Sequence, residues 1–358
     1  MTAGVSGSTV RRFRPGSRRL TTLLVAAAGV VVALIIASVA SVPYVALTPG
    51  PTLNTLGKSG GSPMIEISGR RTYPTSGHLN MVTVSFIGGP GTQFNIFAAL
   101  RAWLSPHDAV VPEEEIFTPG QSEQQVTKQD TEEMVNSQQT AAAAALCQLK
   151  IKFRTVDTVV QTVPGTPAHG VLRPGDVISA VDGKPVTCSA DAATLIRAHR
   201  PGTPLELTIL RKGKPRRFRL VTKNVQGEAV IGVNVQESYV FPFAVKINIT
   251  NIGGPSAGMM FALGIIDKLT PMNLTAGKFI AGTGEIEANG TVDPIGGIQQ
   301  KMAGARAAGA TVFLTPAANC PDTAGAVPAG LRLIKVSTLS GAIRALQALK
   351  AGRPVPSC

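Results

Sequence analysis

Ser256 lies in the segment NIGGPSAGMM, residues 251–260, with two glycines and a proline directly before it and an apolar run after it. The preceding FPFAVKINIT predicts a strand, and SAGMMFALGIIDKL predicts an apolar helix. A serine at such a strand-to-helix turn lies where backbone N–H groups converge, as an oxyanion hole requires. A serine after a proline is also a good helix N-cap, so the pattern leaves open whether Ser256 is a nucleophile or a structural cap.

A serine hydroxyl becomes a useful nucleophile only when a base removes its proton. Residues 254–258 satisfy the pattern G-x-S-x-G, in which an acidic residue and then a histidine follow the serine. All four histidines precede Ser256: His78, His107, His169 and His199. No downstream histidine is therefore present to act as the base. A lysine can act instead if burial lowers its pKa toward neutrality. Six lysines lie near or after the serine: Lys246, Lys268, Lys278, Lys301, Lys335 and Lys350. Lys301 stands out among them because it follows DPIGGIQQ and opens the small-residue helix KMAGARAAGA, where another backbone can approach closely.

These segments closely resemble the proteolytic domain of Lon-type serine proteases, which use a Ser-Lys dyad. GGPSAGMMFALGIIDKL is followed, in the family's order and at compatible separation, by AGTGEIEANGTVDPIGGIQQKMAGARAAGATVFLTP. The resemblance covers residues 228–353. It implies that Ser256 is the nucleophile, Lys301 the general base and Thr283 a hydroxyl that hydrogen-bonds the lysine, with no metal and no organic cofactor. Thr283 and Glu285 could instead only cap a turn.

The sequence departs from the Lon pattern in two respects. Lon proteases usually carry an acidic residue three positions before the serine and a lysine two positions before the catalytic one, where this chain has Gly253 and Gln299. No G-x-x-x-x-G-K-[ST] phosphate loop occurs, so we expect the ATP-driven motor of Lon to be absent.

GHLNMVTVSF, residues 77–86, resembles the opening strand of a Lon proteolytic domain, which predicts that this domain comprises residues 63–140 together with 228–353.

Residues 141–227 are predicted to form a small, mostly β domain. The stretch VPGTPAHGVLRPGDVISAVDGKPV resembles a PDZ domain of the bacterial type, which implies a groove between a strand and a helix where an extended peptide adds as an extra strand. The cluster RKGKPRRFR, residues 211–219, could contact nucleic acid or acidic lipid, but alternation around Lys212-Gly213-Lys214 favours a solvated hairpin. We therefore expect protein or peptide partners and no nucleic acid.

The N-terminal part of the chain predicts a membrane anchor. Of the net charge of +13, five charges come from arginines that precede any acidic residue: Arg11, Arg12, Arg14, Arg18 and Arg19. Residues 20–42 carry no charge and are long enough to cross a hydrocarbon core. The basic tail, residues 1–19, should stay cytoplasmic. Everything after the span should lie on the outer side of the bacterial cell membrane, beginning with an irregular linker at 43–62. A cleaved signal peptide is the alternative, because SVA at 38–40 ends in small residues.

Four cysteines follow the predicted span, in a compartment where disulfides persist. Three pairings are open to four cysteines, and the reduced state is a further alternative. We expect Cys147 to pair with Cys188 and Cys320 with Cys358, since each pair lies within one predicted domain. None has metal-ligand spacing.

Other segments predict further elements. MIEI and HLNMVTVSF, residues 64–67 and 78–86, alternate as strands do, and we expect them to pair across the intervening turn region. Residues 91–105 and 131–149 predict helices. The run EEE at 113–115 is typical of a solvated loop rather than a metal site, because no paired ligand spacing accompanies it.

The expected fold is therefore an α/β (α+β) Lon-type proteolytic domain with a small, mostly β PDZ domain and one N-terminal transmembrane helix. The expected function is that of an ATP-independent, membrane-anchored serine endopeptidase whose PDZ domain selects unfolded or tail-exposed envelope proteins. A homo-oligomer is compatible with this expectation. Two alternatives are a non-catalytic PDZ scaffold with an inactive protease fold and a serine hydrolase that uses an upstream histidine.

Overall fold

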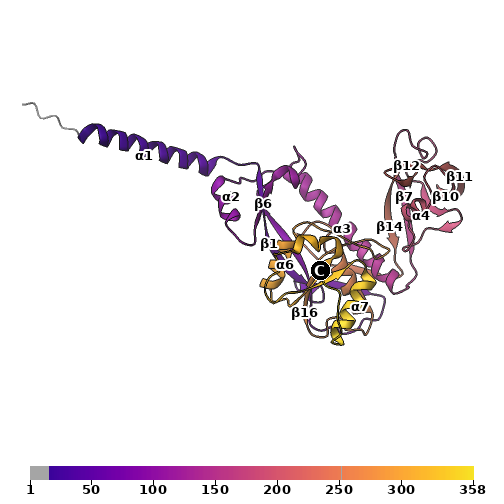
Figure 1. Ribbon diagram of the computed structural model, residues 1–358. Coiled ribbons are helices and arrows are strands. Elements are labelled where there is room, and N and C mark those ends of the chain that lie inside the picture. The colour runs from indigo at the N-terminus through magenta and orange to yellow at the C-terminus, as the bar shows by residue number, and fades with distance from the viewer. Residues whose placement is uncertain (1–15, 251) are drawn as a thin grey trace, which may run out of the picture. The chain divides into compact units, whose positions relative to one another are not determined.

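The computed structural model describes residues 16–250 and 252–358. The predicted cytoplasmic tail lies mostly in residues 1–15, outside the described part. The chain divides into two compact units, one formed by residues up to 46 with 86–120 and one by residues 47–85 with 121–358. Figure 1 shows the elements of both units.

The second unit is built on a sheet with the strand order β20-β19-β16-β5-β1. Four of these strands run parallel, from β5 through β16 and β19 to β20. The strands are β1 (Tyr44–Asn54), β5 (His78–Ile87), β16 (Phe279–Gly282), β19 (Val312–Pro316) and β20 (Arg332–Val336).

Helices cover both faces of this sheet because its central strands are apolar on both sides. On β16, Ile280 belongs to the core that packs under helices α3, α5 and α7, whereas its neighbour Ala281 belongs to a second core under α6. The helices are α3 (Glu123–Gln148), α5 (Gly258–Leu269), α6 (Ile298–Ala307) and α7 (Leu339–Lys350). β16 thus lies between α5 and α6, the helices that follow Ser256 and carry Lys301.

Both of the long helices expected from the sequence are present. The helix predicted at 131–149 begins earlier, at Glu123, because Ser122 and Gln125 form a capping box at its start. The helix predicted within 91–105 is α2 (Ile96–Trp103), capped by the side chain of Asn95.

The two strands expected to pair with each other have different partners. β4 (Ile65–Ser68) pairs antiparallel with β15 (Ala244–Ile247), while β5 pairs with β16. The prediction of this hairpin was wrong because the period-2 pattern identifies a strand but not its neighbour. Smaller pieces complete the unit: β2 (Lys58–Ser59), β3 (Ser62–Pro63), β17 (Glu285–Ile286), β18 (Val292–Asp293), η2 (Ala317–Asn319) and η3 (Pro321–Thr323).

A separate antiparallel sheet, with its own core, follows α3 in the sequence. Its order is β11-β10-β8-β7-β14, and β9 pairs with β8. The elements are β7 (Arg154–Thr162), β8 (Val177–Val181), β9 (Lys184–Pro185), α4 (Ala192–Arg197), β10 (Pro204–Arg211), β11 (Lys214–Val221), β12 (Lys223–Val225), β13 (Glu228–Val230) and β14 (Val233–Val240). The predicted hairpin turn is present, with Lys212 and Gly213 both at positive φ.

The limits expected for this small domain, 141–227, need correction at both ends. β14 was assigned to the proteolytic part, but it pairs with β7 along its whole length and forms the edge of the small sheet. Ala141–Leu146 of α3 instead pack in the main core beside α5.

The first unit contains α1 (Gly16–Val39), α2, β6 (Ala109–Pro112) and the short helix η1 (Glu113–Glu115). Residues 19–39 of α1 are long and apolar enough to cross a membrane, and they are exposed in the structure.

The irregular linker expected at 43–62 is not observed, because β1 occupies most of it and β2 and β3 follow. Its buried run Val45–Leu47 outweighs the neighbouring prolines and glycine in deciding the structure.

Both predicted disulfides are present. Cys147 pairs with Cys188, and Cys320 pairs with Cys358. The first bond joins the end of α3, a helix that packs in the main core, to the segment between β9 and α4, which belongs to the small antiparallel domain. It therefore links two domains instead of lying within one of them.

Candidate active site

Ser256 lies in a turn just before α5, with its side chain half-buried. The N-cap of α5 is Ala257, which has no side chain able to cap, so Ser256 does not fill the N-cap role that the sequence left open. Gly254, two residues earlier, has a φ of 80°, which favours glycine at that position. Within the described residues, the backbone N–H groups of Ser256 and Ala257 donate to no acceptor. The turn therefore presents a hydroxyl together with two N–H groups that have no acceptor among the described residues.

The carbonyl of Ser256 is held by two hydrogen bonds from the segment after β16. The Thr283 hydroxyl donates to it at 3.0 Å, and the Gly284 N–H donates to it at 2.8 Å. The Met259 N–H returns a bond to the Gly284 carbonyl at 3.0 Å. Thr283 thus contacts the backbone of the serine, and in the described part of the chain it makes no hydrogen bond to Lys301, which the family resemblance had implied.

Helix α3 also supports the serine turn, a contribution that the sequence did not reveal. The Ser137 hydroxyl donates to the Pro255 carbonyl at 2.9 Å, and the Gly254 N–H donates to the Asp130 carbonyl at 3.1 Å. A Cβ on Gly253 would come within 2.4 Å of the Asp130 Cβ. The absence of a side chain at 253, which departs from the Lon pattern, therefore matches the close approach of Asp130 of α3 to this residue.

Lys301 occupies the first turn of α6, and the residue is only 4% exposed. Burial lowers the pKa of its amine to about 8, because desolvation disfavours the charged form. No carboxylate lies within ion-pair distance of it among the described residues. An uncompensated buried amine costs stability and is a common feature of catalytic sites.

Both residues lie at the carboxyl ends of parallel strands. Gly282 at the end of β16 is opposite Met81 of β5. Thr283 follows Gly282 directly and donates a hydrogen bond to the Ser256 carbonyl.

Lys301 is placed by the start of α6. Gly297 caps this helix at a φ of 67°, and a Cβ on it would come within 2.6 Å of Val84, three residues beyond Met81 on β5. The Lys301 N–H donates to the Gly297 carbonyl at 3.0 Å, one helical turn on. No hydrogen bond joins the Ser256 hydroxyl to the Lys301 amine in the part of the chain that the structure describes.

Comparison with known proteins identifies the two parts. The family model described as the Lon protease (S16) C-terminal proteolytic domain matches residues 247–347, and the PDZ domain model matches residues 126–222. The chain carries a Lon-type proteolytic domain and a PDZ domain. The PDZ match begins inside α3, whose later residues nevertheless pack with the proteolytic domain.

Individual relatives agree over short stretches. The chain is 46% identical over 69 residues to the Lon protease of Roseiflexus castenholzii, which is 19% of this chain and 8% of that protein. It is 43% identical over 56 residues to a probable periplasmic serine endoprotease DegP-like of Pseudomonas fulva, covering 16% and 12%. The chain therefore spans about a tenth of the length of these relatives. The crystal structure of the PDZ domain of an SdrC-like protein from Listeria innocua is 21% identical, with 22% of this chain and 92% of that one covered and a TM-score of 0.21.

A polar cavity of about 400 Å³ adjoins the serine turn of the proteolytic domain. One side is a single face of α3, and the other is the segment that follows Thr283; the lining residues are Glu133, Asn136, Ser137, Thr140, Pro255, Glu285 and Ile286. Burial, followed by the nearby carboxylates of Asp293, Glu133 and Glu287, raises the pKa of Glu285. Pro255 places this space one residue from the proposed nucleophile.

Within the second unit, no described histidine is hydrogen-bonded to Ser256. His78 pairs with Phe279 at the start of β16, at the opposite end of the strand from Thr283, and stacks on its ring at 4.6 Å. His169 and His199 belong to the PDZ domain, where they contact Thr162 and Asp182.

The PDZ domain has an apolar groove of about 350 Å³ beside its edge strand. The groove lies between α4 and β14, and its apolar lining includes Ile196, Ile231, Val233 and Val235. Gly232 has a φ of 73°, and a Cβ on it would come within 2.2 Å of Thr166, so a side chain there would collide. An unpaired edge strand beside an apolar groove is the geometry that binds an extended peptide by strand addition.

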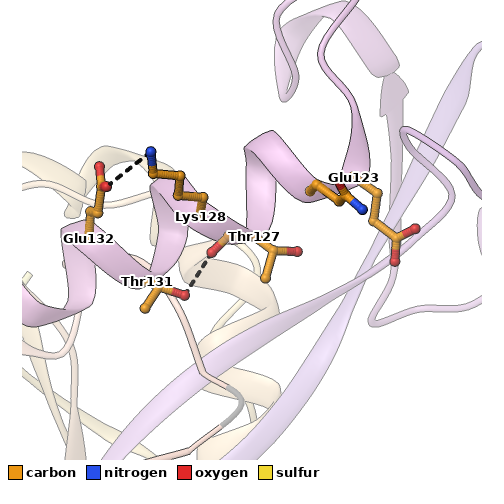
Figure 2. Close-up of a pocket in the computed structure, with 6 residues that line it drawn as sticks. Glu123, Thr127, Lys128, Thr131 and Glu132 are labelled. Carbon is orange, nitrogen blue, oxygen red and sulfur yellow. Dashed lines mark hydrogen bonds and ion pairs between the residues drawn. The ribbon is translucent and has the colours of Figure 1, made fainter.

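The exposed first half of α3 forms a shallow open surface that is separate from these sites. All six lining residues come from this one helix; Figure 2 shows the Lys128–Glu132 ion pair of 3.8 Å and the Thr131 hydroxyl donating to the Thr127 carbonyl. Both side chains of the ion pair are largely exposed, so the pair contributes little. We assign no function to this surface.

Proposed function

We propose that this chain is an ATP-independent, membrane-anchored serine endopeptidase that uses Ser256 as nucleophile and Lys301 as general base. The observation that carries the proposal is the buried amine of Lys301, which has no acidic partner in the described chain and a pKa lowered to about 8. A structural lysine would have a carboxylate beside it or would reach solvent, whereas a general base has to be neutral at working pH.

The reaction would follow from these groups. Neutral Lys301 accepts the Ser256 proton as the serine Oγ attacks a peptide carbonyl carbon, and the N–H groups of Ser256 and Ala257 stabilise the oxyanion. Collapse of this intermediate breaks the C–N bond, and the Lys301 ammonium returns the proton to the leaving amine. Water then attacks the ester by the same steps, which releases the acid and restores Ser256.

Thr283 has a positioning role in this scheme. Its hydroxyl and the Gly284 N–H fix the Ser256 carbonyl, which orients the turn without contacting substrate. Metal and cofactor play no part in the proposed reaction.

Substrate selection is assigned to the PDZ domain. Its groove would bind an extended, apolar peptide segment along the edge of β14 and so select unfolded proteins or exposed tails. Cleavage without ATP is proposed for these 358 residues, which contain no phosphate-loop motif. Disulfides and the apolar α1 support an extracytoplasmic location, with α1 as the anchor.

Cleavage without ATP is the first test. Full-length protein in detergent micelles, incubated with a permanently unfolded protein, should release peptides detectable by mass spectrometry at the same rate with and without ATP. A strict requirement for ATP would contradict the proposal.

A non-catalytic scaffold is the second candidate, because the Ser256 hydroxyl and the Lys301 amine are not hydrogen-bonded to each other in the described chain. Catalytic hydrogen bonds are often long in the absence of substrate, so an assay of binding and cleavage has to separate the scaffold from the enzyme. Peptide binding to the PDZ groove without any cleavage would establish it.

A further inference from the structure

Helix α2 exposes its large apolar side chains to solvent. They recur with helical spacing, and their exposed fractions range from 43% at Ile96 to 76% at Leu104. We name this set the α2 apolar face; its residues are Ile96, Phe97, Leu100, Trp103 and Leu104. Large exposed side chains in one continuous set indicate a surface that something else covers.

The opposite side of α2 is made of small residues. Ala98, Ala99 and the buried Ala102 pack against the core of the first unit, with Ala46 and Phe94. A helix on the surface of a protein surrounded by water turns its largest apolar side chains inward, because the free energy gained on burial is proportional to the apolar area removed from water. Here the arrangement is reversed, so the packing of the first unit does not account for the large side chains.

The start of α2 is fixed to the end of α1. The Val42 N–H donates to the Phe94 carbonyl at 2.8 Å, and the Asn95 side-chain amide donates to the Ser38 carbonyl at 2.9 Å. Ser41 and Asn95 also form an isolated β-bridge. Figure 1 shows α2 beside the end of α1, within the same unit.

The apolar part of α1 fixes where a membrane surface would lie. It extends over 21 residues, Arg19–Val39, which is about 32 Å of helix and matches a hydrocarbon core of about 30 Å. If it spans, Val39 lies at the boundary of the bilayer. Asn95, bonded to Ser38, then holds α2 at that same boundary.

We propose that the α2 apolar face lies in the headgroup and upper acyl region of the leaflet from which α1 emerges. The occupant is the lipid bilayer, since this face is continuous with the end of the exposed apolar helix. A tryptophan suits this depth, because its ring is amphipathic, and Trp103 is 72% exposed. This inference rests on the part of the proposed function in which α1 spans the membrane.

The chain supplies its own probe, since Trp103 is its only tryptophan. Full-length protein is reconstituted into phosphatidylcholine–phosphatidylglycerol vesicles whose lipids carry bromine at shallow or at deep acyl positions. Shallow bromines should quench the Trp103 emission about twofold or more, and more strongly than deep ones. Leu100→Gln should weaken the quenching, whereas Val135→Gln, at a similarly exposed position on α3, should not.

Three results would overturn the proposal. Extraction of the chain from vesicles by alkaline carbonate would refute the anchoring by α1 and the α2 proposal with it. Retention of the chain with Trp103 unquenched by either lipid would refute the α2 proposal alone. Emission that ignores brominated lipid but changes with the protein-to-lipid ratio would assign the face to a second copy of the chain.

Discussion

Ser256→Ala should lower the cleavage of an unfolded protein at least about 1,000-fold, because the serine Oγ forms the covalent intermediate. The loss should appear in kcat, since the PDZ groove and the rest of the substrate surface are unchanged. Steady-state kinetics on the full-length chain in detergent, without ATP, measure it.

Folding should survive this substitution. The Ser256 hydroxyl donates no hydrogen bond among the described residues, and the carbonyl held by Thr283 and Gly284 is retained in alanine. Ser68→Ala, at an exposed serine ending β4, is the matched control and should keep full activity. More than about a tenth of the wild-type rate in Ser256→Ala would exclude this serine as the nucleophile.

Lys301→Met should stabilise the folded protein by about 3 kcal/mol at pH 7. Burial lowers the pKa of Lys301 from 10.5 to about 8, and each unit is equivalent to about 1.4 kcal/mol. Methionine keeps an unbranched apolar chain in the same space and removes the buried charge. Urea unfolding of the full-length chain in detergent, at pH 7 and pH 9.5, measures the difference.

The pH dependence of this gain has a definite sign. Because the folded pKa is lowered, the wild type carries the full penalty below about pH 8 and becomes more stable as pH rises toward 10.5, where the unfolded state also loses its proton. The advantage of methionine should therefore fall to about half by pH 9.5. Lys335→Met, at an exposed lysine of β20, should show neither effect. A destabilised Lys301→Met protein, or a gain that does not change with pH, would show that Lys301 is not buried as a charge.

The candidate site residues could be named from short segments because their chemistry is local. A serine between a glycine-proline turn and an apolar helix defines the strand-to-helix geometry around Ser256. The small residues after Lys301 permit the close packing seen at Gly304, where a Cβ would come within 3.3 Å of the Gly50 carbonyl oxygen. The exclusion of a downstream histidine likewise needed only residue order.

Long-range pairing was harder to predict. The segment at 43–62 reads as a linker because it contains prolines and glycines, yet residues 44–54 form β1 of the main sheet. β14 resembles any alternating strand, and only its ladder with β7 assigns it to the PDZ sheet. In both cases the deciding energy comes from a partner distant in sequence, which local periodicity does not encode.

The contacts that hold the serine turn show the same limit. Thr283 was identified from its motif, but its hydrogen bond to the Ser256 carbonyl follows from where β16 ends. Ser137 and Asp130 of α3 gave no sequence signal, because nothing in that helix distinguishes the turn that meets Pro255 and Gly254.

The measurement that tests the Ser-Lys assignment most directly is the pH dependence of kcat/KM for wild type and Lys301→Met, measured without ATP on one unfolded substrate. For wild type, kcat/KM should rise about tenfold per pH unit below neutrality and level off above a pKa of about 8, where Lys301 is neutral in the free enzyme. Any residual activity of Lys301→Met should lack this rise. A wild-type profile that is flat from pH 6 to 9, or the same rise in Lys301→Met, would contradict the assignment of Lys301 as general base.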